Sequence, residues 1–404
     1  MRTLLYYKCC FFSIILWLVF SGCKKEADNP FAGVPTTGTR MQFTLDSIFL
    51  YASQVYLWRE ALPSYTAFAP RERYGSVSPE LSAFQQELYD ITQIPVNEAT
   101  GLPYEYSGTA TARYSFMEAA SSTEQGTAAV AGLSNYTIAD TVLESAGAQT
   151  GYLLLSAFPS LTLCQQELVA AFTSFAQAGV TSLIINLSSN GGGYVATAQY
   201  LADLIATADM NEKTMFSESY NSLMQGGGAS LLQYQPYLDA AGNTVPYNGR
   251  TATMADVDYS EAGNTYIFSK KGSLGTVKNV YFIVSGSTAS AAEMLISVLK
   301  PYMNVFLIGQ KTYGKPVGFF ALDIDVYSVY LSSFVIKNAN GWYDYFDGMQ
   351  PDIVLTDMTV ALDTALRLIA GTYNEAAVQQ FSRQMPVTEK IAAPLLLENR
   401  RKLR

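Results

Sequence analysis

Histidine is absent from the sequence, and what else is scarce also limits what the protein can do. With no imidazole among 404 residues, a serine nucleophile would need a different base to take its proton. Charged residues make up only 15% of the chain, against about 25% in typical proteins, and the net charge is −9. Phosphate binding relies on clustered Lys and Arg, so the composition argues against a nucleic-acid partner. The only basic run is the C-terminal "ENRRKLR", which we interpret as a solvent-exposed end.

The N-terminus has the features of an export signal. Arg2 and Lys8 lead an apolar run, "CCFFSIILWLVF", which is too short to span a bilayer comfortably. The run ends in Ser21, Gly22 and Cys23. A small pair directly before a cysteine resembles the lipobox of bacterial lipoproteins, in which the cysteine is acylated and becomes the mature N-terminus. An ordinary signal peptide or a short anchor helix is the alternative.

The lipoprotein interpretation assigns a role to each of the four cysteines. The first two are removed with a signal peptide at residues 1–22, and Cys23 carries the lipid, so Cys164 is the one remaining thiol and no internal disulfide can form. Cys164 lies on a helical pattern, where we expect a small buried apolar side chain. Residues 23–40 are predicted to be a flexible tether. We therefore expect a cell-envelope protein, lipid-anchored to a bacterial membrane on its periplasmic or outer-surface side.

Hydrophobic periodicity divides the rest of the chain. Apolar residues at helical spacing predict a small helical N-terminal domain over residues 41–95, and the mixed, Gly-, Ser- and Thr-rich residues 96–150 indicate irregular β-structure. Residues 151–372 alternate strands and helices as βαβα, with "TSLIINL" and "NVYFIV" as buried strands and two further strands within residues 317–336. We predict an α/β fold with additional β-strands, followed by a helical tail at residues 373–404.

Two loops of this core carry glycine patterns with chemical meaning. "NLSSNGGG", residues 186–193, lies between a buried strand and a helix, where backbone N–H groups suit an oxyanion or phosphate; a plain flexible turn is the alternative. "GQKTYGKP", residues 309–316, nearly fits the phosphate-loop pattern G-x-x-x-x-G-K-[ST]. Pro316 replaces the hydroxyl that would hold magnesium, and the residues after it are typical of a strand rather than the required helix. The pattern therefore argues against nucleotide binding.

A third loop, "SGSTASAAE" at residues 285–293, brings small hydroxyl residues to a strand-to-helix turn. Ser290 and Glu293 form S-x-x-E at a helix start, and a capping box alone could account for both. Lys315 lies among apolar residues in the second loop. A free lysine has a pKa near 10.4, but burial can lower it by roughly 3 units and leave a useful neutral fraction at pH 7. A serine paired with such a lysine needs no histidine.

These loops together resemble the catalytic core of the C-terminal (tail-specific) processing peptidases, peptidase family S41. "TASAAE" is similar to the nucleophile motif and "TYGK" to the base motif, so the resemblance assigns Ser290 as nucleophile and Lys315 as base. "NLSSNGGG" is similar to the family's D-L-R-x-N-x-G-G loop, and "YFDGMQPD" to its late G-x-x-P-D element. The resemblance implies an oxyanion hole made by the amides of Ala291 and of Gly192 or Gly193, a core similar to the crotonase and ClpP fold, and no metal or organic cofactor.

The sequence departs from the family pattern in three places. Asn186 and Ser188 stand where members usually have the Asp and Arg of a loop-bracing ion pair. Phe319 occupies a position where many members carry a Gln that helps to orient the lysine. Residues 96–150 are short for a PDZ domain and lack its carboxylate-binding loop, so we expect that domain to be reduced or absent.

We therefore predict a serine endopeptidase that hydrolyses peptide bonds of envelope or extracellular polypeptides through a Ser290/Lys315 dyad. The alternative is a catalytically silent surface lipoprotein that binds peptide or glycan, for which the 28 tyrosines and an insert at residues 208–262 would be suited. A phosphate-loop hydrolase, a third hypothesis, predicts nucleotide binding and magnesium dependence. The sequence leaves open the natural substrate, the cleavage motif and the oligomeric state.

Overall fold

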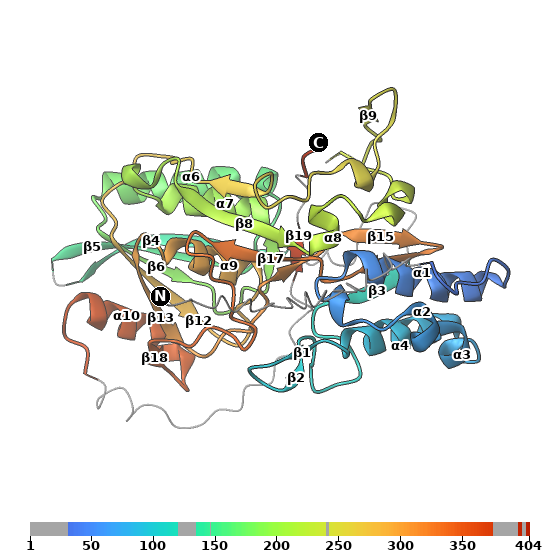
Figure 1. Cartoon of the computed structure of the whole chain (residues 1–404). Helices are drawn as coiled ribbons and strands as arrows, with labels where there is room; N and C mark the ends of the chain where they lie inside the picture. Colours follow the sequence, from blue (N-terminus) through green and yellow to red (C-terminus); the bar gives the residue numbers. More distant parts are fainter. Residues whose placement is uncertain (1–30, 120–134, 146, 240–241, 375–394, 398–400) are drawn as a thin grey trace, which may run out of the picture.

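The computed structural model describes residues 31–119, 135–145, 147–239, 242–374, 395–397 and 401–404 (Figure 1). The expected signal peptide, Cys23 and part of the expected tether lie outside these residues. Within the described part of the chain, none of the helices has both the length and the apolar character that crossing a bilayer requires.

The helical N-terminal region consists of short helices packed around one longer helix. Its α-helices are α1 (Arg40–Val55), α2 (Tyr65–Phe68), α3 (Pro70–Tyr74) and α4 (Glu80–Thr92). Helix α1 begins at a capping box, in which the Thr39 hydroxyl accepts from the Gln42 N–H and the Gln42 side chain accepts from the Thr39 N–H. Its apolar face is buried, with Leu45 and Ile48 at 0% exposure, so α1 is the core of this region.

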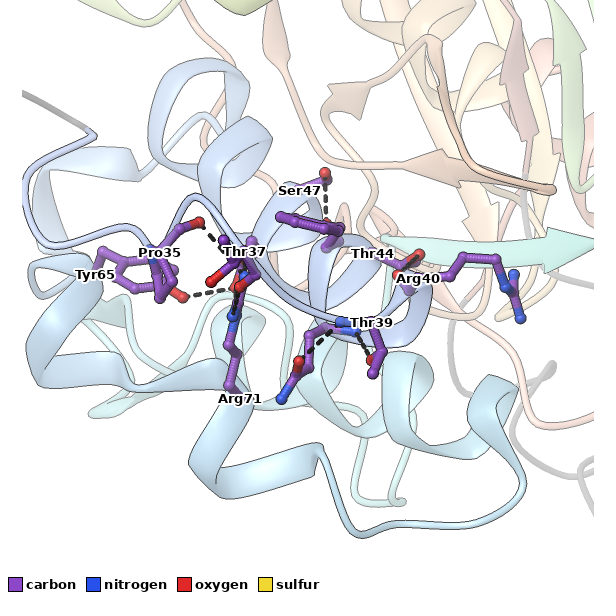
Figure 2. A network of polar contacts seen from close by, with 11 residues as sticks. Pro35, Thr37, Thr39, Arg40, Thr44, Ser47, Tyr65 and Arg71 are labelled. Atoms are coloured by element: carbon purple, nitrogen blue, oxygen red, sulfur yellow. Dashed lines mark hydrogen bonds and ion pairs between the residues drawn. The ribbon is translucent and has the colours of Figure 1, made fainter.

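A buried ion pair fixes the packing of α1 against α3. The Arg71 guanidinium donates to both carboxylate oxygens of Asp46, with Nη2 2.6 Å from Oδ2, and the Tyr65 hydroxyl donates to Asp46 at 2.6 Å. Arg71 also donates from Nη1 to the Thr37 carbonyl at 2.7 Å (Figure 2). These bonds connect α3 to α1 and to the segment that precedes α1.

The core is a six-stranded sheet whose neighbouring strands are parallel except at one edge. In spatial order the strands are β18 (Ile353–Val354), β13 (Asn304–Gly309), β12 (Asn279–Val284), β6 (Ser182–Asn186), β5 (Ala148–Leu155) and β4 (Ile138–Ser145). Only β4 and β5 are antiparallel. Residues 183–185 of β6 and residues 280–284 of β12 are apolar because both faces of these strands are covered.

Helices cover both faces of this sheet (Figure 1). They are α6 (Leu161–Gln177), α7 (Val195–Ile205), α9 (Ala291–Leu299) and α10 (Ala361–Ile369). Helix α10 packs on the opposite face from α6 and α7, against a separate apolar cluster that includes Ile184, Ile283 and Ile308. Cys164 on α6 is fully buried, as the sequence predicted. The predicted α/β class with a helical N-terminal region and additional strands is confirmed.

Two smaller sheets extend the core. One has the order β11 (Thr265–Ile267), β8 (Thr214–Tyr220), β17 (Phe334–Asn338) and β14 (Val317–Gly318), and the other β15 (Ala321–Ile324), β16 (Tyr327–Tyr330) and β3 (Phe116–Ala119). The expectation of two strands within residues 317–336 was wrong, because four strands occupy or enter this stretch. Asp325, with a φ of 56°, forms the tight turn that separates β15 from β16.

The remaining strands and α-helix of the described residues are short. They are β1 (Val96–Asn97), β2 (Leu102–Pro103), β7 (Gly192–Tyr194), α8 (Ser222–Gln225), β9 (Pro246–Tyr247), β10 (Arg250–Thr251) and β19 (Leu395–Leu397). We expected a helical tail at residues 373–404. Among the described residues of this stretch the structure instead has the strand β19, which pairs with β7. The basic end is not simply solvated either, because Leu403 forms a bridge with Val257 and is partly buried.

Replacing the buried carboxylate at Asp46 should destabilise the protein. Asp46→Asn leaves Arg71 without its ion-pair partner in a site where both side chains are nearly inaccessible, at 4% and 11% exposure. We expect a loss of about 3 kcal/mol in the free energy of unfolding, measured by urea denaturation. The control is Asp363→Asn, which breaks an exposed pair with Arg367 and should cost less than about 0.5 kcal/mol. Equal effects of the two substitutions would contradict the role given to Asp46.

Candidate active site

Three loops meet at the carboxyl ends of neighbouring parallel strands. They follow β6, β12 and β13, which lie side by side in the sheet, so the loops leave it at the same edge. Backbone hydrogen bonds join them. The Ala289 N–H donates to the Asn190 carbonyl at 3.1 Å, and the Tyr313 N–H donates to the Thr288 carbonyl at 2.9 Å. The fold therefore brings together the three loops that the sequence singled out.

A single buried carboxylate, that of Glu293, joins the serine loop to the lysine loop. Its Oε2 accepts from the N–H groups of Ser290 at 2.9 Å and Lys315 at 2.8 Å. Its Oε1 accepts from the Gly314 N–H at 2.7 Å and from the Thr312 hydroxyl at 2.5 Å. Because the backbone nitrogens of Ser290 and Lys315 contact the same oxygen atom, the two residues lie next to each other. Of the capping box predicted for Ser290 and Glu293, the bond from the Ser290 N–H to the Glu293 carboxylate is present, and the same carboxylate also holds the lysine loop.

Ser290 has the backbone strain and the buried hydroxyl expected of a functional position. Its φ is 61° and its ψ −117°, a combination that L-residues rarely adopt. The side chain is 1% exposed, and its Oγ has no hydrogen-bond partner among the described residues. Ala291 follows at the first position of α9, where the backbone N–H has no intrahelical acceptor. The strained turn thus presents an unbonded hydroxyl beside an available amide donor.

The Lys315 side chain is almost inaccessible, and its ammonium is poorly solvated. It is 2% exposed, and Nζ lies 4.3 Å from the centroid of the Phe319 ring. Burial lowers the pKa of Lys315 from 10.5 to about 7, against the opposing effect of the carboxylates of Glu105 and Glu293, which favour the charged form. At pH 7 about half of the lysines would then be neutral and able to accept a proton.

Glu105 was missed by the sequence reasoning, which looked for carboxylates only near Lys315 in the chain. It is fully buried and accepts from the N–H groups of Tyr114 and Ser115, at 3.2 and 2.7 Å, and from the Ser115 hydroxyl at 2.7 Å. The Tyr114 hydroxyl in turn donates to the Gly314 carbonyl at 2.6 Å. A segment about 200 positions earlier in the chain therefore supports the lysine loop. The one available signal was an acidic residue within the aromatic run "PYEYS".

The glycine loop distinguishes between the two predicted oxyanion donors. The Gly192 N–H donates to the Asn190 side chain at 2.9 Å, so this amide is engaged. Gly193 has a φ of 137°, and a Cβ there would lie 2.1 Å from the Phe158 carbonyl oxygen, so only glycine fits. The geometry favours Gly193 over Gly192 as the donor that would accompany Ala291.

Neutral hydrogen bonds brace the glycine loop at Asn186 and Ser188, the two positions where the sequence departs from the ion pair of the family pattern. The Asn186 side-chain oxygen accepts from the Ser188 N–H at 3.0 Å and from its hydroxyl at 2.7 Å. The Asn186 amide nitrogen donates to the Tyr152 hydroxyl at 3.1 Å. Within the described residues, no cluster of three or more His, Cys, Asp or Glu side chains could hold a metal ion.

The family follows from a sequence match. The model of peptidase family S41 matches residues 149–355, just over half of the chain and the part that contains all three loops. The chain belongs to peptidase family S41. This is a family of serine-type peptidases, and the match agrees with the resemblance carried by the "TASAAE" and "TYGK" motifs. A comparison with curated protein sequences gave no match.

Solved structures of partial similarity include S41 proteases. A protein described as an S41 protease from Bacteroides fragilis is 21% identical with a TM-score of 0.43, and the match covers 58% of each chain. The photosystem II D1 C-terminal processing protease is 16% identical over 85% of this chain and 100% of its own, with a TM-score of 0.49. A lipoprotein from Streptococcus agalactiae is 13% identical over 83% and 98%, with a TM-score of 0.48. The S41 assignment rests on the sequence match and not on these scores.

The lysine pKa predicts a pH profile for this S41 protein. A general base at Lys315 would carry a proton below about pH 7 and could not accept another, so kcat/KM should fall roughly tenfold per pH unit on the acid side and level off above pH 7. Glu105→Gln removes a charge that favours the ammonium, so the acid limb should move to lower pH. The exposed Glu98→Gln is the matched control and should leave the profile unchanged. A shift to higher pH in Glu105→Gln would contradict the assignment.

Proposed function

We propose that this S41 protein is a serine endopeptidase in which Ser290 is the nucleophile and Lys315 is the general base. One observation carries the proposal: the Glu293 carboxylate holds the backbone of both residues through the same oxygen atom, at 2.9 and 2.8 Å. The pKa of about 7 for Lys315 supports it, because a base must be largely neutral at the working pH.

The chemistry follows the usual course of acyl transfer. Lys315 Nζ takes the proton from Ser290 Oγ as the oxygen attacks the carbonyl carbon of the scissile peptide. The amides of Ala291 and Gly193 donate to the oxyanion of the tetrahedral intermediate. The protonated lysine then gives its proton to the departing amine, which leaves an ester on Ser290. Lys315 next removes a proton from a water molecule, which hydrolyses that ester and releases the acid.

A covalent probe tests the nucleophile without knowledge of the substrate. A fluorophosphonate probe should label the wild-type protein at Ser290, and Ser290→Ala should abolish both labelling and cleavage of an unfolded polypeptide. Ser287→Ala, in the same turn, is the control and should retain both. Lys315→Arg should be as inactive as Lys315→Met, because arginine keeps the charge and does not release its proton. A wild type that binds peptides yet neither labels nor cleaves would instead support the silent binding lipoprotein.

We propose further that the protein is anchored to a membrane of the cell envelope by a lipid on Cys23. The support is the sequence alone, in which a short apolar run ends in Ser21, Gly22 and Cys23 ahead of a polar segment. Substrates would then be envelope or extracellular polypeptides.

The anchor can be tested separately from the peptidase activity. Cys23→Ser should move the protein from the membrane fraction to the soluble fraction of cells, and mass spectrometry of the wild type should find an acylated N-terminal cysteine. Cys164→Ser is the control, since that thiol is buried within the folded domain and should not affect partitioning. An unmodified N-terminus in the wild type would overturn the proposal.

A further inference from the structure

The C-terminal strand of the chain lies on the glycine loop of the candidate active site. Strand β19 runs parallel to β7, with Leu395 opposite Gly192, Leu396 opposite Gly193 and Leu397 opposite Tyr194. It also contacts β14, which begins two residues after Lys315. In Figure 1, β19 lies near the middle of the view.

The pairing uses the backbone groups of Gly193. The Gly192 carbonyl accepts from the Phe158 N–H at 2.8 Å, and the Tyr194 N–H donates to the Phe158 carbonyl at 2.9 Å. Since successive residues of a strand turn their N–H and C=O groups to opposite sides, those of Gly193 face the other side, where β19 lies. The chain's own C-terminal strand therefore covers the amide that the proposed mechanism needs for the oxyanion.

The last four residues are held by a second set of backbone bonds. The Asp258 N–H donates to the Lys402 carbonyl, and the Arg404 N–H donates to the Asp256 carbonyl, both at 2.9 Å. Val257 and Leu403 are the partners of this antiparallel bridge. All of these bonds join main chain to main chain, so they do not depend on the side chains of the bound segment.

Side chains add affinity at the same place. The Tyr237 hydroxyl donates to the Arg401 carbonyl at 2.7 Å, and the Arg401 guanidinium lies 4.6 Å from the Phe320 ring centroid. Tyr247 donates to the Arg404 carbonyl, and Lys402 Nζ donates to the Gly263 carbonyl at 3.2 Å. The segment between β8 and β11, which supplies most of these contacts, thus forms a docking site for the basic end of an otherwise acidic chain.

We propose that β7 and the docking site at residues 237–239 and 242–263 form one polypeptide-binding groove, and that residues 395–397 and 401–404 fill it as an internal competitor of substrate. The inference rests on the proposed peptidase function. It adds the way in which substrate binds, namely as an extended segment that forms an extra strand beside β7. A tethered competitor acts at an effective concentration in the millimolar range, so the groove is occupied in the intact chain. Substrate enters when the tail leaves.

Removal of the tail should activate the enzyme. A chain that ends at Pro394 should cleave a fluorogenic peptide with a kcat/KM about tenfold or more above that of the full chain, mainly through a lower KM. A synthetic peptide of residues 395–404 should inhibit the shortened enzyme competitively, and a scrambled peptide, which lacks the side-chain contacts, should inhibit it more weakly. Leu403→Asp in the full chain weakens the docking of the tail and should activate the enzyme partially. This second variant keeps the test valid if the shortened protein fails to fold.

A binding measurement separates this inference from the proposed function. Fluorescently labelled peptide 395–404 should bind the shortened Ser290→Ala protein and bind the full-length Ser290→Ala protein at least tenfold more weakly. Binding without any peptidase activity in either wild-type form would support the groove and overturn the peptidase. Equal kcat/KM of the full and shortened enzymes together with no peptide binding would overturn the groove. Cleavage of the peptide by the shortened enzyme, without inhibition, would also overturn its role as a competitor.

Discussion

The buried carboxylate of Glu293 is the interaction on which the candidate site depends. A carboxylate removed from water is costly unless its oxygens are hydrogen-bonded, and Glu293 accepts one bond from the helix start at Ser290 and three from the lysine loop. Burial raises its pKa, and those four donors oppose the rise by favouring the charged form. The positions of Ser290 and Lys315 are thus set by the need of one anion for donors. The strand order only brings the loops near enough for this to happen.

Lys315 works under two opposing influences. Desolvation favours the neutral amine, whereas Glu105 and Glu293 favour the ammonium, and the result is a pKa of about 7. Either influence alone would serve the chemistry less well: a lysine without nearby carboxylates would be a weaker base, and an exposed one would stay charged. Phe319, which stands where many family members have Gln, contributes to the desolvation of Lys315, and its ring contacts Nζ.

The sequence predicted those elements whose pattern is contained in a few neighbouring residues. The run "NVYFIV" has the same bounds as β12, because a buried strand of a parallel sheet is a short apolar run bounded by polar residues. The capping pattern likewise placed the start of α9. Contacts across the fold could not be predicted in this way. Glu105 supports the lysine loop from 210 positions earlier in the chain, and β19 pairs with β7 through backbone groups that are the same in every residue.

The support that Glu105 and Tyr114 give to the lysine loop has a consequence for how the protein can be divided. The family match begins at residue 149, so a fragment cut at that boundary keeps Ser290, Glu293 and Lys315. It loses Glu105, the Tyr114 hydroxyl bonded to the Gly314 carbonyl, and strand β3, which pairs with β16. The segment that precedes the matched core therefore supports the loop that carries the proposed base. Recombinant fragments and domain swaps should keep the two together.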